Sequence, residues 1–218
     1  MRVQSLYTVF DLAIAPGVTC RVLASLLALQ RAEQPELRIQ LHQVSIPDLL
    51  QGVHTGRYKA GIAYTAGAAS PNLQALDMWL DDLAVALPER SPLLAHPQIP
   101  LNALQTYQLI RWTAPTCPDF DLEMKTLLAR DNTARTSMQC VDSFELMATL
   151  ASAGYGVGIA LRSRIVEARN WGVVMRPFDH TRYRVKTQLL WPLRPEEAAV
   201  EQLAERARRI VSALASSR

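Results

Sequence analysis

The sequence is poor in cysteine and glycine, and its cysteines show no paired spacing. The 218 residues include Cys20, Cys117 and Cys140, none of which belongs to a CxxC motif. An odd number of unpaired cysteines argues against a secreted disulfide framework and against a zinc site built from cysteines. Nine glycines, 13 prolines and 49% hydrophobic residues exclude collagen-like, low-complexity and wholly disordered chains.

Long apolar runs and clusters of basic residues are also missing. The apolar stretch Val22–Leu29 ends at Gln30-Arg31, well short of the roughly 18 residues that a transmembrane helix needs. The first residues have neither the apolar segment nor the cleavage site of a signal peptide. Lysines and arginines exceed acidic residues by only three, and no run of them could follow a phosphate backbone. We therefore expect a cytoplasmic protein with no membrane contact and no nucleic-acid binding by this segment alone.

Strand and helix patterns alternate along the first third of the chain. A turn signal at Pro16-Gly17 follows the first predicted strand, and Pro35 ends the first predicted helix. The pattern predicts strands over residues 7–15, 37–44 and 60–64 and helices over residues 19–34 and 45–54. This βαβαβ order is typical of a parallel sheet.

A second α/β pattern follows, and the chain then returns to a strand and a helix. The predicted strands cover residues 73–87, 107–112, 136–141, 157–161 and 183–191, and the predicted helices cover 122–130, 143–153 and 195–214. Asp142 is expected to cap the helix over 143–153, with Glu145 three residues on. We predict an α/β fold of two Rossmann-like subdomains with a cleft between them. Subdomain I would comprise 1–83 plus 185–218, and subdomain II would comprise 84–184.

Ligands of open parallel sheets bind outside the carboxyl ends of the strands. The segments in this position are Pro16–Cys20, Ser45-Ile46, Tyr64-Thr65, Trp112–Thr116 and Asp142-Ser143. Helix N-termini at three of them would favour an anion, although Thr19, Ser45 and Ser143 could equally be ordinary helix caps. The candidate binding residues are Gly17, Val18, Thr19, Cys20, Ser45, Ile46, Tyr64, Arg111, Trp112, Thr113, Phe120 and Ser143.

Arg111 and the aromatic residues near it are the most chemically suggestive candidates. Arg111 could pair with a carboxylate through two hydrogen bonds, and Trp112 and Phe120 could supply an apolar wall. Strand alternation lets only one of Arg111 and Trp112 face a ligand. We predict a small organic anion as the ligand.

Several segments resemble the effector-binding domain of LysR-type transcriptional regulators. They are Leu12–Ala15, Gln34–Ile39, Asp48–Leu50, Gly56–Ala63, Glu145–Leu150 and Ala153–Ile159, and the resemblance extends over residues 10–215. It implies a periplasmic-binding-protein-like (type 2) fold with a small-molecule effector in the cleft. It also implies a homodimer or higher homo-oligomer, and DNA contact only through an N-terminal winged helix-turn-helix that this sequence lacks. Lys59 departs from the family, which usually has aspartate there.

Two alternatives to effector sensing remain open at this point. The chain could be a stand-alone small-solute-binding protein. It could also sense oxidants through Cys117. This cysteine follows a predicted strand, and the resemblance to peroxide-sensing members of the family implies a reactive cysteine at that place. The alternative is that Cys20, Cys117 and Cys140 are three unrelated thiols. We expect no enzyme, no metal and no cofactor, because none of the four histidines lies in a catalytic or ligand motif.

Overall fold

The chain forms two compact α/β units in the computed structural model. The structure describes residues 8–18, 20–65, 72–115, 117, 120–122, 124–126, 137–179, 183–195 and 198–216. Unit 1 comprises Met1–Trp79 with Lys186–Arg218, and unit 2 comprises Leu80–Val185. The chain passes between the units twice, along β4 (Leu73–Pro88) and β9 (Arg184–Pro192). Among the described residues, no helix has the length and apolar character needed to cross a membrane.

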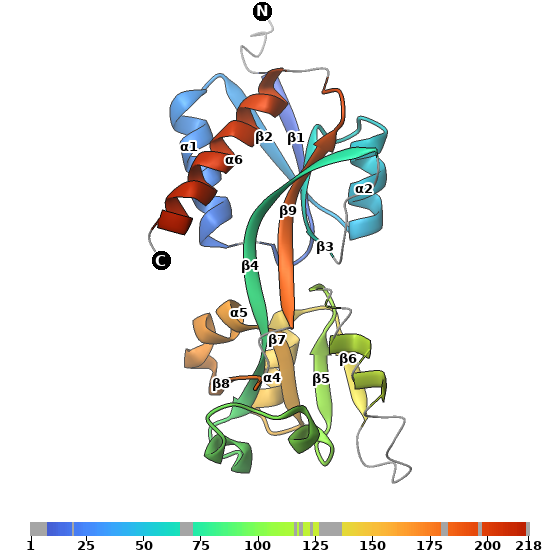
Figure 1. Ribbon diagram of the computed structural model, residues 1–218, viewed down its shortest axis with the longest axis vertical. Coiled ribbons are helices and arrows are strands. Elements are labelled where there is room, and N and C mark those ends of the chain that lie inside the picture. The colour runs from blue at the N-terminus through green and yellow to red at the C-terminus, as the bar shows by residue number, and fades with distance from the viewer. Residues whose placement is uncertain are drawn as a thin grey trace, which may run out of the picture. The chain divides into compact units, whose positions relative to one another are not determined.

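Unit 1 is built on a parallel sheet of the order expected for a βαβαβ segment. Strand β1 (Thr8–Ile14) lies between β2 (Leu37–Gln43) and β3 (Ala60–Thr65), and β9 pairs antiparallel with β3. The helices are α1 (Arg21–Glu33), α2 (Ile46–His54) and α6 (Ala198–Ser216). Helices α1 and α6 lie side by side, with α2 on the opposite side of the sheet (Figure 1).

An ion-pair cluster joins the first and last helices of unit 1. Arg206 Nε lies 2.9 Å from Glu33 Oε2, and an Arg209 guanidinium nitrogen lies 2.6 Å from the same oxygen. The hydrogen bond from Arg209, assisted by Arg206, holds the pKa of Glu33 below its ordinary value, although partial burial opposes the shift. Arg206 and Arg209 stand 173 and 176 positions after Glu33 in the sequence. Both therefore connect α6 to the same carboxylate of α1.

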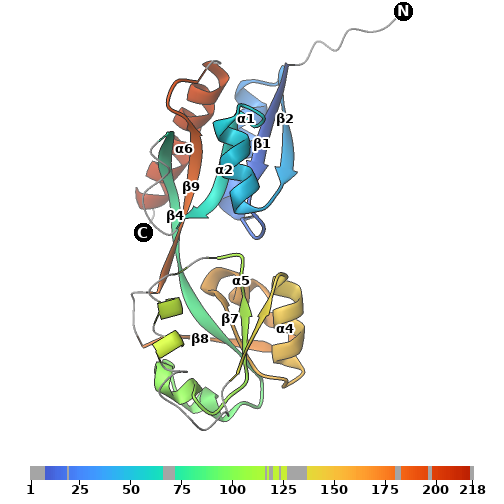
Figure 2. The same ribbon diagram turned by 90° about the vertical axis from the view of Figure 1, so that its right-hand side faces the viewer.

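Unit 2 has a second sheet with its own helices. Strand β5 (Leu109–Trp112) pairs parallel with β6 (Met138–Val141) and β7 (Val157–Leu161). Strand β4 pairs antiparallel with β7 and with β8 (Val173–Pro177). Helices α4 (Phe144–Ser152) and α5 (Arg162–Glu167) pack beside β7 (Figure 2). Unit 2 also contains three 3₁₀ turns, Pro92–Ala95, Leu101–Leu104 and Arg169–Trp171, and helical residues at 120–122 and 124–126.

Most of the expected elements are confirmed, and the differences lie in unit 2. The N-cap of α4 is Ser143, whose Oγ accepts the Leu146 N–H at 3.2 Å. The expectation that Asp142 caps this helix was therefore wrong. In the helix expected over 122–130, the residues that the structure describes, 122 and 124–126, are helical, and 127–130 lie outside the described residues.

Helix α5 and strand β8 were not expected from the sequence. With six and five residues, both are too short to show a clear period.

Glu33 makes the stability of unit 1 depend on pH. Because the folded pKa is lowered, the stabilisation is present above the unfolded value of about 4.3 and is lost as pH falls through the folded value. We expect Glu33→Gln to unfold at lower urea than the wild type at pH 7, and the two midpoints to converge as the pH falls through the lowered pKa of Glu33. Glu201→Gln, an exposed change on α6, is the control. A difference that persists undiminished at low pH would contradict this role.

Candidate functional site

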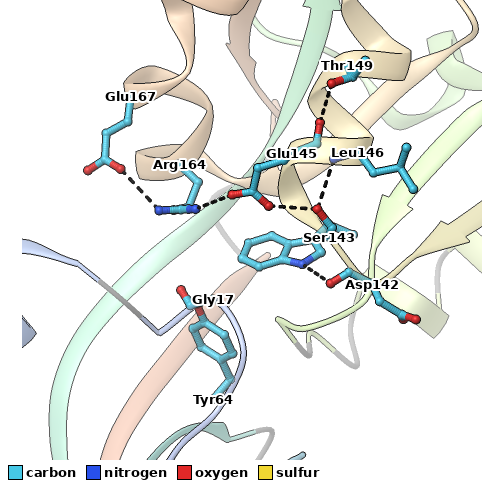
Figure 3. A network of polar contacts seen from close by, with 10 residues as sticks. Gly17, Tyr64, Asp142, Ser143, Glu145, Leu146, Thr149, Arg164 and Glu167 are labelled. Atoms are coloured by element: carbon cyan, nitrogen blue, oxygen red, sulfur yellow. Dashed lines mark hydrogen bonds and ion pairs between the residues drawn. The ribbon is translucent and has the colours of Figure 1, made fainter. Parts of the chain in front are cut away.

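The carboxyl end of β1 in unit 1 is a tight turn held by a tyrosine. Gly17 has φ +81°, a conformation that glycine adopts at little cost. The Tyr64 hydroxyl donates a 2.5 Å hydrogen bond to the Gly17 carbonyl oxygen (Figure 3). Val18 is buried, and its N–H donates to the Ala15 carbonyl at 3.3 Å. Three predicted residues, Gly17, Val18 and Tyr64, are thus brought together at the end of one strand.

Helix α1 begins directly after this turn without a negative charge in its first turn. Cys20 occupies the N-cap position, and no acidic residue stands in the first turn. The first N–H groups of a helix and its dipole attract an anion. Thr19, the other candidate here, lies outside the described residues.

Helix α2 differs because its N-terminus already faces a carboxylate. The Ser45 Oγ accepts the Asp48 N–H at 3.2 Å and donates to Asp48 Oδ2 at 2.6 Å. Ser45 is therefore the N-cap, Ile46 is the first helical residue and Asp48 lies in the first turn. The Asp48 carboxylate disfavours an anionic ligand at this N-terminus. Sequence reasoning overlooked Asp48, although the spacing of Ser45 and Asp48 is close to that of a capping box.

In unit 2, the loops after β5 and β6 are joined by hydrogen bonds. The Thr113 N–H donates to the Val141 carbonyl at 3.0 Å, and the Thr113 hydroxyl lies 3.1 Å from Asp142 Oδ1. The Trp112 indole N–H reaches the Asp142 carbonyl at 3.3 Å. Trp112 is buried and meets Phe144 of α4 edge-on, with ring centroids 5.5 Å apart. Thr113 is exposed at this edge, whereas Trp112 belongs to the core of unit 2.

The N-terminus of α4 also carries a carboxylate, in a chain of polar contacts. Ser143 Oγ donates to Glu145 Oε2 at 2.8 Å, and Arg164 reaches Glu145 Oε1 at 3.3 Å (Figure 3). Arg164 also lies 3.7 Å from Glu167. Hydrogen bonds from its own backbone N–H and from Ser143, together with the charge of Arg164, lower the pKa of Glu145. Ser143 is therefore a helix cap beside an ionised carboxylate.

Arg111 holds the loop that follows β5. Its guanidinium donates 2.8 Å hydrogen bonds to the carbonyls of Trp112 and Pro115, and its Nε lies 3.8 Å from Asp121 Oδ1. Burial lowers the pKa of Arg111, while the charge of Asp121 opposes the shift. Strand alternation was expected to let only one of Arg111 and Trp112 face a ligand. Both are buried, Trp112 against Phe144 and Arg111 by the loop whose carbonyls it binds.

The remaining two candidates are core residues of unit 2. Phe120 is fully buried, with its ring edge-on to Tyr183 and tilted against Phe178. Cys117 is 2% exposed, so an oxidant in solution has little access to its sulphur. Among the described residues, no group of three histidine, cysteine or acidic side chains gathers as a metal site.

These features together define a class of protein. Each of the two α/β units has loops and helix N-termini at the carboxyl ends of its parallel strands, and two strands carry the chain from one unit to the other. This arrangement is a periplasmic-binding-protein-like (type 2) fold. The family described as LysR substrate binding domain matches residues 8–211, and the chain belongs to this family.

Comparisons with individual proteins agree with this assignment. A probable cat1 operon transcriptional activator of Acinetobacter lwoffii is 24% identical over 151 residues, which are 69% of this chain and 50% of that protein. The chain thus spans about half the length of this curated relative. The BenM effector binding domain with its effector benzoate has a TM-score of 0.76 and 17% identity, covering 95% of this chain and 93% of that one. Full-length CbnR complexed with its target DNA has a TM-score of 0.74 and 16% identity, covering 93% and 70%. At these identities the two structures support the fold.

Replacing Arg111 should destabilise unit 2 rather than simply remove a ligand contact. Arg111→Met leaves two loop carbonyls without a buried donor, at a cost of about 2–4 kcal/mol in the free energy of unfolding. We expect Arg111→Lys to fall between Arg111→Met and the wild type, because one ammonium cannot match the forked guanidinium. Urea unfolding measures the effect, with exposed Arg162→Met as the control. Equal stability of Arg111→Met and the wild type would refute the structural role.

Proposed function

We propose that the chain is the effector-sensing domain of a LysR-type transcriptional regulator that acts in the cytoplasm and is not an enzyme. Residues 1–83 plus 185–218 would form regulatory subdomain I, and residues 84–184 would form subdomain II. A small organic anion would bind at the carboxyl ends of the strands and contact both subdomains. Membership of the LysR substrate binding domain family supports this proposal.

The N-terminus of α1 carries the proposal that the effector is an anion. Of the three helix N-termini considered, those of α2 and α4 have Asp48 and Glu145 in their first turns, whereas that of α1 has no acidic residue. A negative charge on the ligand therefore meets the least repulsion at α1. Gly17, held by Tyr64, lets the backbone approach the ligand closely.

Control of transcription would follow from a shift between conformational states. A ligand changes such an equilibrium only as far as it binds one state better than the other. The relatives include a transcriptional activator and a regulator solved with its target DNA. We propose that an N-terminal DNA-binding segment in the whole protein converts effector binding into altered contact with a promoter.

A groove on unit 1 supports assembly into a homodimer. Its volume is ≈ 670 Å³, and its walls come from α1 and β2, including Leu27, Ile39 and Leu41. Leu41 is 42% exposed, and β2 is the terminal strand of the described sheet order. We propose that a second copy covers this apolar surface, since exposed apolar grooves commonly mark interfaces.

The anion proposal is tested by placing a carboxylate at the N-cap of α1. Cys20→Asp preserves good capping chemistry but occupies the N-terminus with a negative charge. We expect it to weaken binding of a small carboxylate by roughly tenfold or more, measured by calorimetry. The ligands are a panel of small carboxylates beginning with benzoate, each compared with its uncharged amide.

Ser91→Asp is the matched control for this experiment. Ser91 is the N-cap of the 3₁₀ turn Pro92–Ala95 in unit 2, so the change adds the same charge at another cap. We expect it to leave the affinity for the carboxylate within about twofold, because Ser91 belongs to none of the segments proposed to bind the ligand. Binding of amides as tight as that of acids, or Cys20→Asp with normal affinity, would refute the anion proposal.

The dimer proposal is tested by a charge in the α1–β2 groove. Leu41→Glu should raise the dissociation constant of the dimer by about tenfold or more, because the interface would bury a charged side chain in place of an apolar one. Leu193→Glu, at a residue of unit 1 that is 52% exposed, should leave it unchanged. Light scattering over a dilution series gives the mass of each variant. A monomeric wild type at all concentrations would exclude the proposed interface.

A further inference from the structure

Unit 1 contains a buried hydroxyl that has no hydrogen-bond partner. Thr187, on β9, is 1% exposed, and its Oγ1 meets no donor or acceptor in the part of the chain that the structure describes. Among the described residues, four other side chains bury an unpartnered polar atom, but each makes a hydrogen bond through another of its atoms: Gln30, Arg164, Gln188 and Arg206. The Thr187 side chain has only its hydroxyl. Burial of an unpartnered hydroxyl costs stability, so such a group requires an explanation.

Strand register shows which face of the sheet the Thr187 side chain occupies. Thr187 lies opposite Tyr64 in the antiparallel pair of β3 and β9 (Figure 1), and directly opposite residues share a face. A Cβ placed on Gly61 would meet Leu49 and Val53 of α2. Because faces alternate along a strand, Tyr64, three residues after Gly61, points away from α2. Thr187 therefore lies on the face of the sheet that α1 and α6 cover.

The turn that leads into α1 lies over this same face. The Tyr64 hydroxyl reaches the Gly17 carbonyl (Figure 3), so the tyrosine side chain extends from the end of β3 to that turn. Thr187 is the residue next to Tyr64 on the neighbouring strand, and all three residues belong to unit 1. The first turn of α1 contains no acidic residue, and its dipole attracts an anion. The unpartnered hydroxyl thus faces the end of α1 where a negative charge is favoured.

We propose that Thr187 is a specificity-determining residue of the effector site, whose hydroxyl donates a hydrogen bond to a carboxylate of the ligand. This inference rests on the proposed function, in which an organic anion binds at the N-terminus of α1. A carboxylate has two oxygens, so one can accept N–H groups of α1 while the other accepts the Thr187 hydroxyl. A hydrogen bond to an ionised acceptor is roughly twice as strong as one between neutral groups. The contact therefore favours an acid over the corresponding amide.

A hydroxyl kept for a ligand differs from a structural hydroxyl in its effect on stability. A buried structural hydroxyl bonds to another group of the protein, and its removal leaves that group without a partner. The Thr187 hydroxyl has no such partner, so the ligand-free protein loses no hydrogen bond when it is removed. Since threonine is β-branched, few side-chain rotamers are open to it, and the hydroxyl keeps its direction without a ligand. Removal of this hydroxyl is expected to weaken binding without lowering stability.

Thr187→Val tests the proposal, because it replaces the hydroxyl by a methyl group of similar size. The probes are benzoate, phenylacetate and succinate, with benzamide as the uncharged comparison, and calorimetry gives each affinity. For every carboxylate that the wild type binds, we expect an affinity at least about tenfold lower in Thr187→Val, because a hydrogen bond to a charged group is lost. In urea, the ligand-free variant should unfold at a midpoint equal to or above that of the wild type.

Two further variants serve as controls. Thr187→Ser keeps the hydroxyl and should stay within roughly threefold of the wild-type affinity, which is less than the loss of a hydrogen bond to a charged group. Thr149→Val makes the same chemical change on α4 of unit 2, where the exposed Thr149 donates to the Glu145 carbonyl. It should leave the affinity unchanged and should not raise the urea midpoint.

The results separate this inference from the proposed function. Unchanged carboxylate affinity in Thr187→Val, or a urea midpoint below that of the wild type, would overturn the role of Thr187 and leave the anion site in place. A wild type that binds none of the three carboxylates would contradict the anion site itself, and the Thr187 contact together with it.

Discussion

Parallel strand pairing is the constraint on which both units depend. Strands that run in the same direction need a crossover helix between them, so their carboxyl ends meet at one edge of the sheet. In unit 1 this brings the turn at Gly17 close to Tyr64, and in unit 2 it joins Thr113 to Asp142. Within each unit, these residues are therefore neighbours because of topology, although they are far apart in the sequence.

The sequence was a good guide wherever local pattern decided the structure. Alternation over residues 37–43, the turn at Pro16-Gly17 and the long apolar face of α6 predicted real elements. Short elements such as β8 gave no usable period. The N-cap of α4 was misassigned because Asp142 and Ser143 are both good caps, and only the backbone angles distinguish them.

Side-chain roles were harder to predict than positions. Arg111 stands at the end of a strand, where a ligand-binding arginine would be expected, yet its hydrogen bonds go to two carbonyls of its own loop. Phe120 was considered as an apolar wall but lies among Phe178 and Tyr183 in the core. Both outcomes depend on which face of the sheet is covered, and this is decided by segments distant in sequence.

The double crossing of the chain along β4 and β9 has a consequence for biosynthesis. Unit 2 is one uninterrupted stretch, Leu80–Val185, so all its strands are available as soon as that stretch has left the ribosome. Unit 1 is interrupted: Glu33 is made early, whereas Arg206 and Arg209 arrive only after β9 and the first turns of α6 have been synthesised. Domains generally fold as units during synthesis. Unit 2 therefore completes its contacts before unit 1 does, although synthesis of unit 1 begins first. The half-built sheet of β1, β2 and β3 must remain without its final strand and helix while the whole of unit 2 is translated.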